Sequence, residues 1–161
     1  MALDAAELAG ATVEALDVRE LALPFYEPRL RSHPGVERLV EAIAAADGLI
    51  WSSPLYHGTV SGVFKNALDW LQVLSDRQPP FLSEKPVGLI ATAAGIQGLQ
   101  AINTMEFVVR ALRGWTVPFV VPISRSWEAF ADDGQSKDQA VAAQLHMLGR
   151  EVAVAARRFA A

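Results

Sequence analysis

Short apolar runs alternate with helix-patterned segments along this chain, and no other feature limits its fold as strongly. The apolar runs are short and have strand length: 48–53, 87–93 and 116–124. The segments that separate them repeat apolar residues with the 3.6-residue period of a helix: 36–47, 60–73 and 99–114. Alternating strands and helices build βαβ units, whose strands run parallel. The sequence therefore predicts an α/β fold, an open parallel sheet with helices on both faces.

Further elements are expected toward the two ends of the chain. Residues 12–18, TVEALDV, alternate in the manner of a strand. Ser136 and Gln139 have the spacing of a capping box that would begin a last helix. Pro118 and Pro122 predict an edge position for the 116–124 strand, because proline has no N–H to give to a neighbouring strand.

Composition excludes several classes of protein. The 161 residues, of which 52% are hydrophobic, suit one domain over 1–161 with a sizeable core. A net charge of −4 without a basic patch argues against nucleic-acid binding, and the absence of cysteine excludes disulfides and thiolate metal sites. No run approaches the ~20 apolar residues of a membrane span, and the acidic start MALDAAELAG is not typical of a signal peptide. We expect a cytoplasmic protein that does not bind a membrane.

The connection after the 48–53 strand carries unusual chemistry for its position. In open parallel sheets, ligands bind outside the carboxyl ends of the strands, and this connection reads Pro54-Leu55-Tyr56-His57-Gly58. The proline stiffens the chain, the glycine permits a sharp bend, and the two rings combine flat apolar surfaces with hydrogen-bonding tips. Such a lining suits a planar, partly polar ligand. The alternative is that Tyr56 covers the core and His57 is merely solvated.

The segment SSPLYHGTVSGVFKNALDWL at 52–71 resembles the signature of the NADPH-dependent FMN reductase family. In that family the strand ends in Ser-Pro-x-Tyr, and the next helix reads Leu-Lys-Asn-Ala-Leu-Asp. Two further stretches are similar to family segments: 17–28 to the second strand and its loop, and 92–118 to the third signature loop and its helix. The resemblance extends from about residue 10 to 125 and implies a flavodoxin-like fold.

The resemblance also implies a function and a site. Family members pass hydride from NADPH or NADH to FMN, and the electrons go on to a small acceptor such as free flavin, a quinone, an azo dye or a metal oxyanion. The protein orients the cofactors and needs no catalytic side chain or metal. The residues expected to line FMN are Pro54, Leu55, Tyr56, His57 and Gly58 at the ring and ribityl chain, and Thr92, Ala93 and Gly95 at the pyrimidine edge. A plain turn is the alternative interpretation of the second group.

Two expectations concern the surface and the assembly. Lys65, Asn66 and Asp69 are interpreted as surface contacts without a chemical role. Because family members are usually dimers or tetramers, the resemblance implies a homodimer or homotetramer, with the 60–73 and 98–113 helices as candidates for the interface.

The beginning of the chain departs from the family pattern. In the family, a strand and a Gly-Ser-x-Arg-x-x-Ser loop that holds the FMN phosphate precede the first helix, whereas MALDAAELAG lies where that helix should already be under way. Three explanations stay open: a shortened chain, a flavin-free protein that keeps the fold for assembly, or a phosphate held elsewhere, for example near Arg125 or by a neighbouring subunit. Without the first strand, residues 12–18 would have to pair with 48–53 or leave buried backbone groups unpaired, at about 1–3 kcal/mol for each group.

Two functions of different classes remain. The first is an NAD(P)H-dependent flavin oxidoreductase. The alternative is a truncated, non-catalytic flavodoxin-like scaffold or interaction protein without bound FMN. A flavodoxin-type electron carrier fits less well, because such carriers are commonly more acidic than a net charge of −4.

Overall fold

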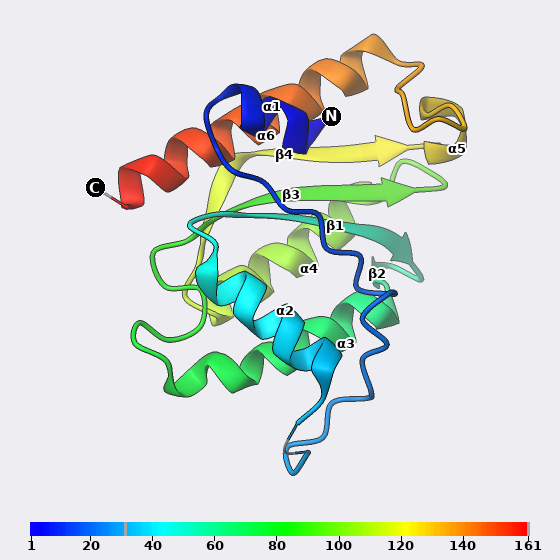
Figure 1. Cartoon of the computed structure of the whole chain (residues 1–161). Helices are drawn as coiled ribbons and strands as arrows, with labels where there is room; N and C mark the ends of the chain where they lie inside the picture. Colours follow the sequence, from blue (N-terminus) through cyan, green and yellow to red (C-terminus); the bar gives the residue numbers. More distant parts are fainter. Residues whose placement is uncertain (31, 161) are drawn as a thin grey trace.

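A mostly parallel sheet forms the centre of the computed structural model, which describes residues 1–30 and 32–160 (Figure 1). Its strands are Leu49–Tyr56 (β1), Thr59–Val60 (β2), Pro86–Ala93 (β3) and Trp115–Ser124 (β4). The helices are Ala2–Leu8 (α1), Pro34–Ala45 (α2), Gly62–Trp70 (α3), the 3₁₀ helix Leu71–Asp76 (η1), Gly98–Ala111 (α4), Ser126–Ala129 (α5) and Gln139–Phe159 (α6). The strand order is β2-β1-β3-β4, with β2 antiparallel to β1 and the other pairs parallel. The predicted α/β alternation is confirmed, as is the edge position of β4.

Two helical layers cover the faces of the sheet: α1 and α6 lie on one face, and α2, α3 and α4 on the other (Figure 1). Because the side chains of a strand alternate between faces, Leu89 and Ala91 of β3 enter the larger core on the α2–α4 side, whereas Ile90 enters the smaller core under α6. Seven of the eight β3 residues are buried, as expected of a strand covered on both faces. Within the described residues, no helix has the length and apolar character needed to cross a membrane.

The predicted strand at 12–18 is wrong. Residues 11–17 pair with no strand, and no backbone hydrogen bond joins them to β1. The segment instead crosses in front of β1 (Figure 1), with Leu16 and Val18 half-buried against the larger core. A segment with a strand-like pattern forms a strand only where a neighbouring backbone pairs with it. On the outer side of β1, residues 49–54 pair with no such segment. Only two of the eight β1 residues are buried, so β1 behaves as an edge strand over most of its length.

Element boundaries also differ from the prediction in two places. β1 continues through Pro54 to Tyr56 rather than ending at residue 53. The capping box at Ser136 and Gln139 is wrong, because the N-cap of α6 is Asp138, whose carboxylate accepts hydrogen bonds from the amides of Ala140 and Val141. A carboxylate at that position satisfies free N–H groups and also favours the positive end of the helix dipole.

Helix α1 owes its position to close packing on α6. Seven residues are too few for a stable isolated helix. Gly149 of α6 lies directly beneath it, and a Cβ added to Gly149 would lie 1.9 Å from the carbonyl oxygen of Ala2. The Arg157 guanidinium donates a hydrogen bond to the carbonyl oxygen of Ala9, next to the carboxyl end of α1. The two helices therefore approach each other at backbone distance.

Substitution Gly149→Ala is expected to lower the free energy of unfolding by about 1–3 kcal/mol, because the new methyl group collides with backbone and displaces α1. The collision outweighs the ~1 kcal/mol that alanine contributes in a helix. Gly62→Ala, on α3, is the matched control, since a Cβ there meets nothing within 4 Å. Urea titrations of both variants measure the difference; equal stabilities would contradict the packing described for α1.

Candidate functional site

The carboxyl ends of the three parallel strands meet at one edge of the sheet. In the ladders, Pro54 of β1 pairs with Thr92 of β3, and Ala93 of β3 pairs with Ser124 of β4. The connections that follow β1 and β3 therefore leave the sheet side by side, at the right-hand end of the strands in Figure 1. Open parallel sheets bind their ligands at this edge.

A tight turn follows β1 and presents the two rings predicted for the site. Tyr56 pairs with Thr59 in an antiparallel ladder, which leaves His57 and Gly58 as a two-residue turn. Their φ angles of +50° and +86° are those of a type I′ hairpin turn, which is uncommon for a histidine. Tyr56 is 59% exposed and so does not cover the core, while His57 is exposed and Pro54 is half-buried. The turn is a rigid element with an accessible aromatic surface.

Ser53 fastens this turn to the sheet, and the sequence analysis missed it. It is the only polar side chain buried in the described part of the chain. Its Oγ accepts a hydrogen bond from the Ser61 amide at 3.1 Å and donates to the Pro54 carbonyl oxygen at 3.1 Å. The Ser61 hydroxyl in turn caps α3 by accepting from the Phe64 amide. The available signal was a serine inside an apolar strand, where a hydroxyl must find a partner.

The connection after β3 offers backbone donors. Thr92 is half-buried and Ala93 is buried, and both are paired in β3, so their backbones belong to the sheet. Among the described residues, no hydrogen bond uses the amides of the next three residues, Ala94, Gly95 and Ile96. Backbone N–H groups without a partner are available to donate hydrogen bonds to a ligand. Of the second predicted group, Gly95 thus lies in the free turn, while Thr92 and Ala93 support it from the strand.

The two connections carry no fixed charge. No Asp, Glu, Lys or Arg occurs in 48–64 or in 86–105, although such residues make up 20% of the chain. The nearest charge in sequence after β1 is Lys65, which pairs with Asp69 at 2.5 Å on the surface of α3, as predicted. Three exposed apolar residues surround the turns: Tyr56, Ile96 and Leu99. The site suits a flat molecule with one polar edge.

Arg125, considered as a phosphate ligand, lies on the other side of this site. It follows β4 with a left-handed backbone, and its guanidinium pairs with Glu128 at 3.2 Å. Strand β3 separates it from β1, so it is far from the open side of the sheet. The described residues include no cluster of three or more His, Cys, Asp or Glu side chains suited to a metal ion.

Asn66 has a structural role that the sequence analysis did not assign. Instead of a surface contact, its half-buried amide donates to the Pro24 carbonyl oxygen and accepts from the Tyr26 amide, each at 2.9 Å. Trp70 Nε1 donates to the same Pro24 oxygen at 2.9 Å. These hydrogen bonds hold the loop that precedes α2 against helix α3. Spacing alone could not reveal partners 40 and 42 residues away.

Known proteins match this chain in sequence. The family described as NADPH-dependent FMN reductase matches residues 1–128. The NADPH-dependent FMN reductase ArsH of Acidithiobacillus ferrooxidans is 32% identical over 118 residues, which are 73% of this chain and 49% of the relative. An FMN-dependent NADPH-azoreductase of Staphylococcus aureus is 38% identical over 96 residues, 60% of this chain and 48% of the relative. The chain spans about half the length of the curated relatives it matches.

Solved structures match it in fold. FerB, a flavoenzyme NAD(P)H:(acceptor) oxidoreductase from Paracoccus denitrificans, superposes with a TM-score of 0.76 at 22% identity, over 98% of this chain and 88% of that chain. A flavodoxin, WrbA-like protein from Agrobacterium tumefaciens has a TM-score of 0.58 at 19% identity, over 73% and 71% of the two chains. The predicted flavodoxin-like fold is confirmed.

Substitution Ser53→Ala is expected to loosen the turn after β1, because the Ser61 amide loses its acceptor. The free energy of unfolding should fall by about 1–3 kcal/mol, and amide hydrogen exchange at residues 55–61 should accelerate. Ser52→Ala is the matched control: Ser52 is the exposed neighbour in the same strand. If both variants exchange at the wild-type rate, Ser53 does not hold the turn.

Proposed function

The chain belongs to the NADPH-dependent FMN reductase family, and on that premise we propose that it is an NAD(P)H-dependent flavin oxidoreductase. The carboxyl edge of the sheet is the observation that carries the proposal. There a stiff aromatic turn lies beside amides that have no partner among the described residues, and neither connection bears a fixed charge. A binding surface of that kind suits a planar cofactor with one polar edge, such as FMN.

The residues present fit the flavin ring. The turn from Pro54 to Gly58 would hold its flat face, since the proline and the tyrosine offer accessible planar surface on a rigid backbone. The connection that begins at Thr92 and Ala93 and includes Gly95 would hold the polar edge, since its amides are free to donate. Ser53 positions the first of these elements through Ser61 and so acts on the ring indirectly.

When bound, FMN supplies the chemistry by accepting hydride from NADPH or NADH and giving electrons to an acceptor. The chain contributes position and electrostatics. Amides that donate at the polar edge of the ring favour added electron density there, and they are already oriented before the reaction. Tyr56, Ile96 and Leu99 form an apolar rim that would border the bound ring.

An uncharged, planar electron acceptor suits this rim better than a charged one. The two connections contain no fixed charge that would attract an oxyanion or a metal complex, and the side chains around them are apolar. Stacking on the ring and contact with Tyr56 and Ile96 would bind an aromatic molecule such as a quinone, an azo compound or a second flavin. Free flavin and quinone acceptors therefore fit the proposal.

The phosphate half of FMN is where the alternative function differs from the first. The open side of β1 lies where a phosphate-binding loop is expected in the family, and Arg125 lies beyond β3. Losing two or three charge-assisted contacts, at about 1.5–3 kcal/mol each, would weaken FMN binding by a hundredfold or more. A chain that binds no flavin at all would act as a flavodoxin-like scaffold or interaction protein.

Riboflavin has the ring of FMN without its phosphate. Comparing the affinities for the two molecules therefore tests separately whether the chain holds the ring and whether it holds the phosphate. This chain is expected to bind both with dissociation constants within about threefold, because the ring is held and the phosphate is not. An N-terminally extended chain carrying the family's phosphate loop should prefer FMN by about a hundredfold or more. Fluorescence quenching of each flavin during titration measures both ratios. If neither flavin binds at saturating concentration, the scaffold function replaces the oxidoreductase.

A charge on the rim is expected to reverse the acceptor preference. In Ile96→Lys, kcat/KM for the ferricyanide anion should rise by about fivefold, the effect of ~1 kcal/mol from a nearby charge in water. The value for the neutral quinone menadione should fall, because the apolar contact with Ile96 is lost. Leu8→Lys, at an equally exposed apolar residue on α1, is the control and should change neither value. Equal effects of the two variants would place the acceptor elsewhere.

A further inference from the structure

Gln97 places a carboxamide against the free turn after β3. The residue is exposed, and although it is the N-cap of α4, its side chain makes no capping hydrogen bond. A Cβ added to Gly95 would lie 2.4 Å from the Oε1 of Gln97, 3.4 Å from its Cδ and 3.6 Å from its Nε2. The side chain therefore folds back over Gly95 with its oxygen closest to the turn. A carboxamide combines an oxygen that accepts hydrogen bonds with an NH₂ group that donates them.

The polar edge of a flavin ring needs both kinds of group. Along this edge the ring presents a carbonyl oxygen, the N3–H group and a second carbonyl oxygen, so its own order is acceptor, donor, acceptor. The amides of Ala94, Gly95 and Ile96 are free to donate to the two oxygens, but an amide N–H cannot accept a hydrogen bond from N3–H. A ring donor that leaves water and finds no acceptor lowers the affinity. The donors of this turn therefore need an acceptor beside them.

Gln97 is the side chain in this connection that has such an acceptor. Of the four residues at 94–97, which read Ala-Gly-Ile-Gln, it alone carries a side-chain oxygen. Thr92 has a hydroxyl, but side chains alternate along β3. Ala91 enters the larger core and Ile90 the smaller one, so Thr92 shares the α6 face of the sheet with Ile90. Gln97 begins α4, which covers the opposite face.

We infer that the Gln97 carboxamide oxygen accepts the hydrogen bond from N3–H of a bound flavin and so selects rings with a donor between two carbonyl groups. The inference rests on the proposed function, which assigns the polar edge of the ring to this connection. The side chain has no capping bond to break, so it can turn from Gly95 to the ring while the backbone amides stay in place. Gln97 thus acts in recognition and takes no part in the transfer of hydride.

The first turn of α4 also carries a matched side chain. Gln100 is exposed like Gln97, but its Oε1 lies beside the other connection, 3.5 Å from a Cβ added to Gly58. The two carboxamides therefore face different parts of the site. Replacing either one removes the same chemical group from the same helix, and only the loss of Gln97 should change how N3 is recognised.

Binding of 3-methylriboflavin, in which a methyl group replaces the hydrogen on N3, tests the assignment by fluorescence titration beside riboflavin. The wild type should bind the methylated flavin about tenfold more weakly, because Oε1 loses its donor and meets a methyl group. In Gln97→Ala the two dissociation constants should agree within about twofold. Gln97→Glu keeps an oxygen in place and should retain the preference for riboflavin. Gln100→Ala is the control and should keep the wild-type ratio.

The outcomes distinguish this inference from the function on which it rests. If the wild type binds both flavins equally, or if Gln97→Ala keeps the wild-type preference, another group or none accepts from N3–H, and the inference is overturned while the flavin site stands. Equal loss of the preference in Gln97→Ala and Gln100→Ala would also overturn it, because the effect would then come from α4 as a whole. If the wild type binds neither flavin at saturating concentration, the proposed function and the inference are both overturned.

Discussion

The two parallel ladders of β3 are the interaction on which the rest of the structure depends. β3 is buried on both faces, it pairs with β1 on one side and β4 on the other, and its alternate side chains enter both cores. These ladders also fix the register that brings Pro54 beside Thr92 and Ala93 beside Ser124. The carboxyl edge of the sheet, and with it the candidate site, follows from that register. A shift of one residue in either ladder would turn every side chain of the shifted strand to the other face and displace the connection that follows it.

The unpaired outer edge of β1 accounts for the unusual path of the chain between α1 and α2. Over residues 49–54 no strand pairs with its outer side, and the chain from α1 to α2 crosses there without joining the sheet. The site remains rigid because other contacts restrain it: Ser53 fastens the turn after β1, and β2 pairs with Leu55 and Tyr56. The proposed ring side of the flavin site is thus built on strands, and over residues 49–54 the outer side of β1 is an open sheet edge.

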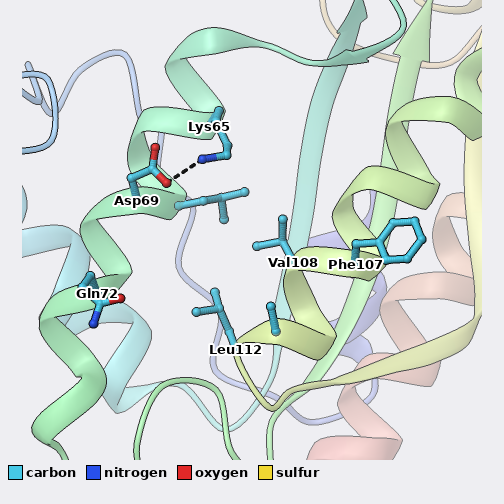
Figure 2. Close-up of a pocket in the computed structure, with 8 residues that line it drawn as sticks. Lys65, Asp69, Gln72, Phe107, Val108 and Leu112 are labelled. Carbon is cyan, nitrogen blue, oxygen red and sulfur yellow. Dashed lines mark hydrogen bonds and ion pairs between the residues drawn. The ribbon is translucent and has the colours of Figure 1, made fainter.

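Helix α3 connects the site with the rest of the surface. Its N-cap, Ser61, is tied to the buried serine of β1, and its next turns hold Pro24 and Tyr26 by hydrogen bonds. Its other flank forms a groove against α4 (Figure 2). Helix α3 therefore begins at the turn that is proposed to hold the flavin ring, and it also supports the loop that precedes α2.

The sequence by itself determined the α/β class, the order of most elements and the family, because these depend on local periodicity and on a specific run of residues at 52–71. It did not determine that residues 12–18, despite their strand-like pattern, would pair with no strand. It also did not determine the roles of Ser53 and Asn66. Those depend on which backbone or hydroxyl lies nearby after the chain has folded. A strand requires a neighbour, and a buried polar group requires a partner; only the tertiary structure supplies either one.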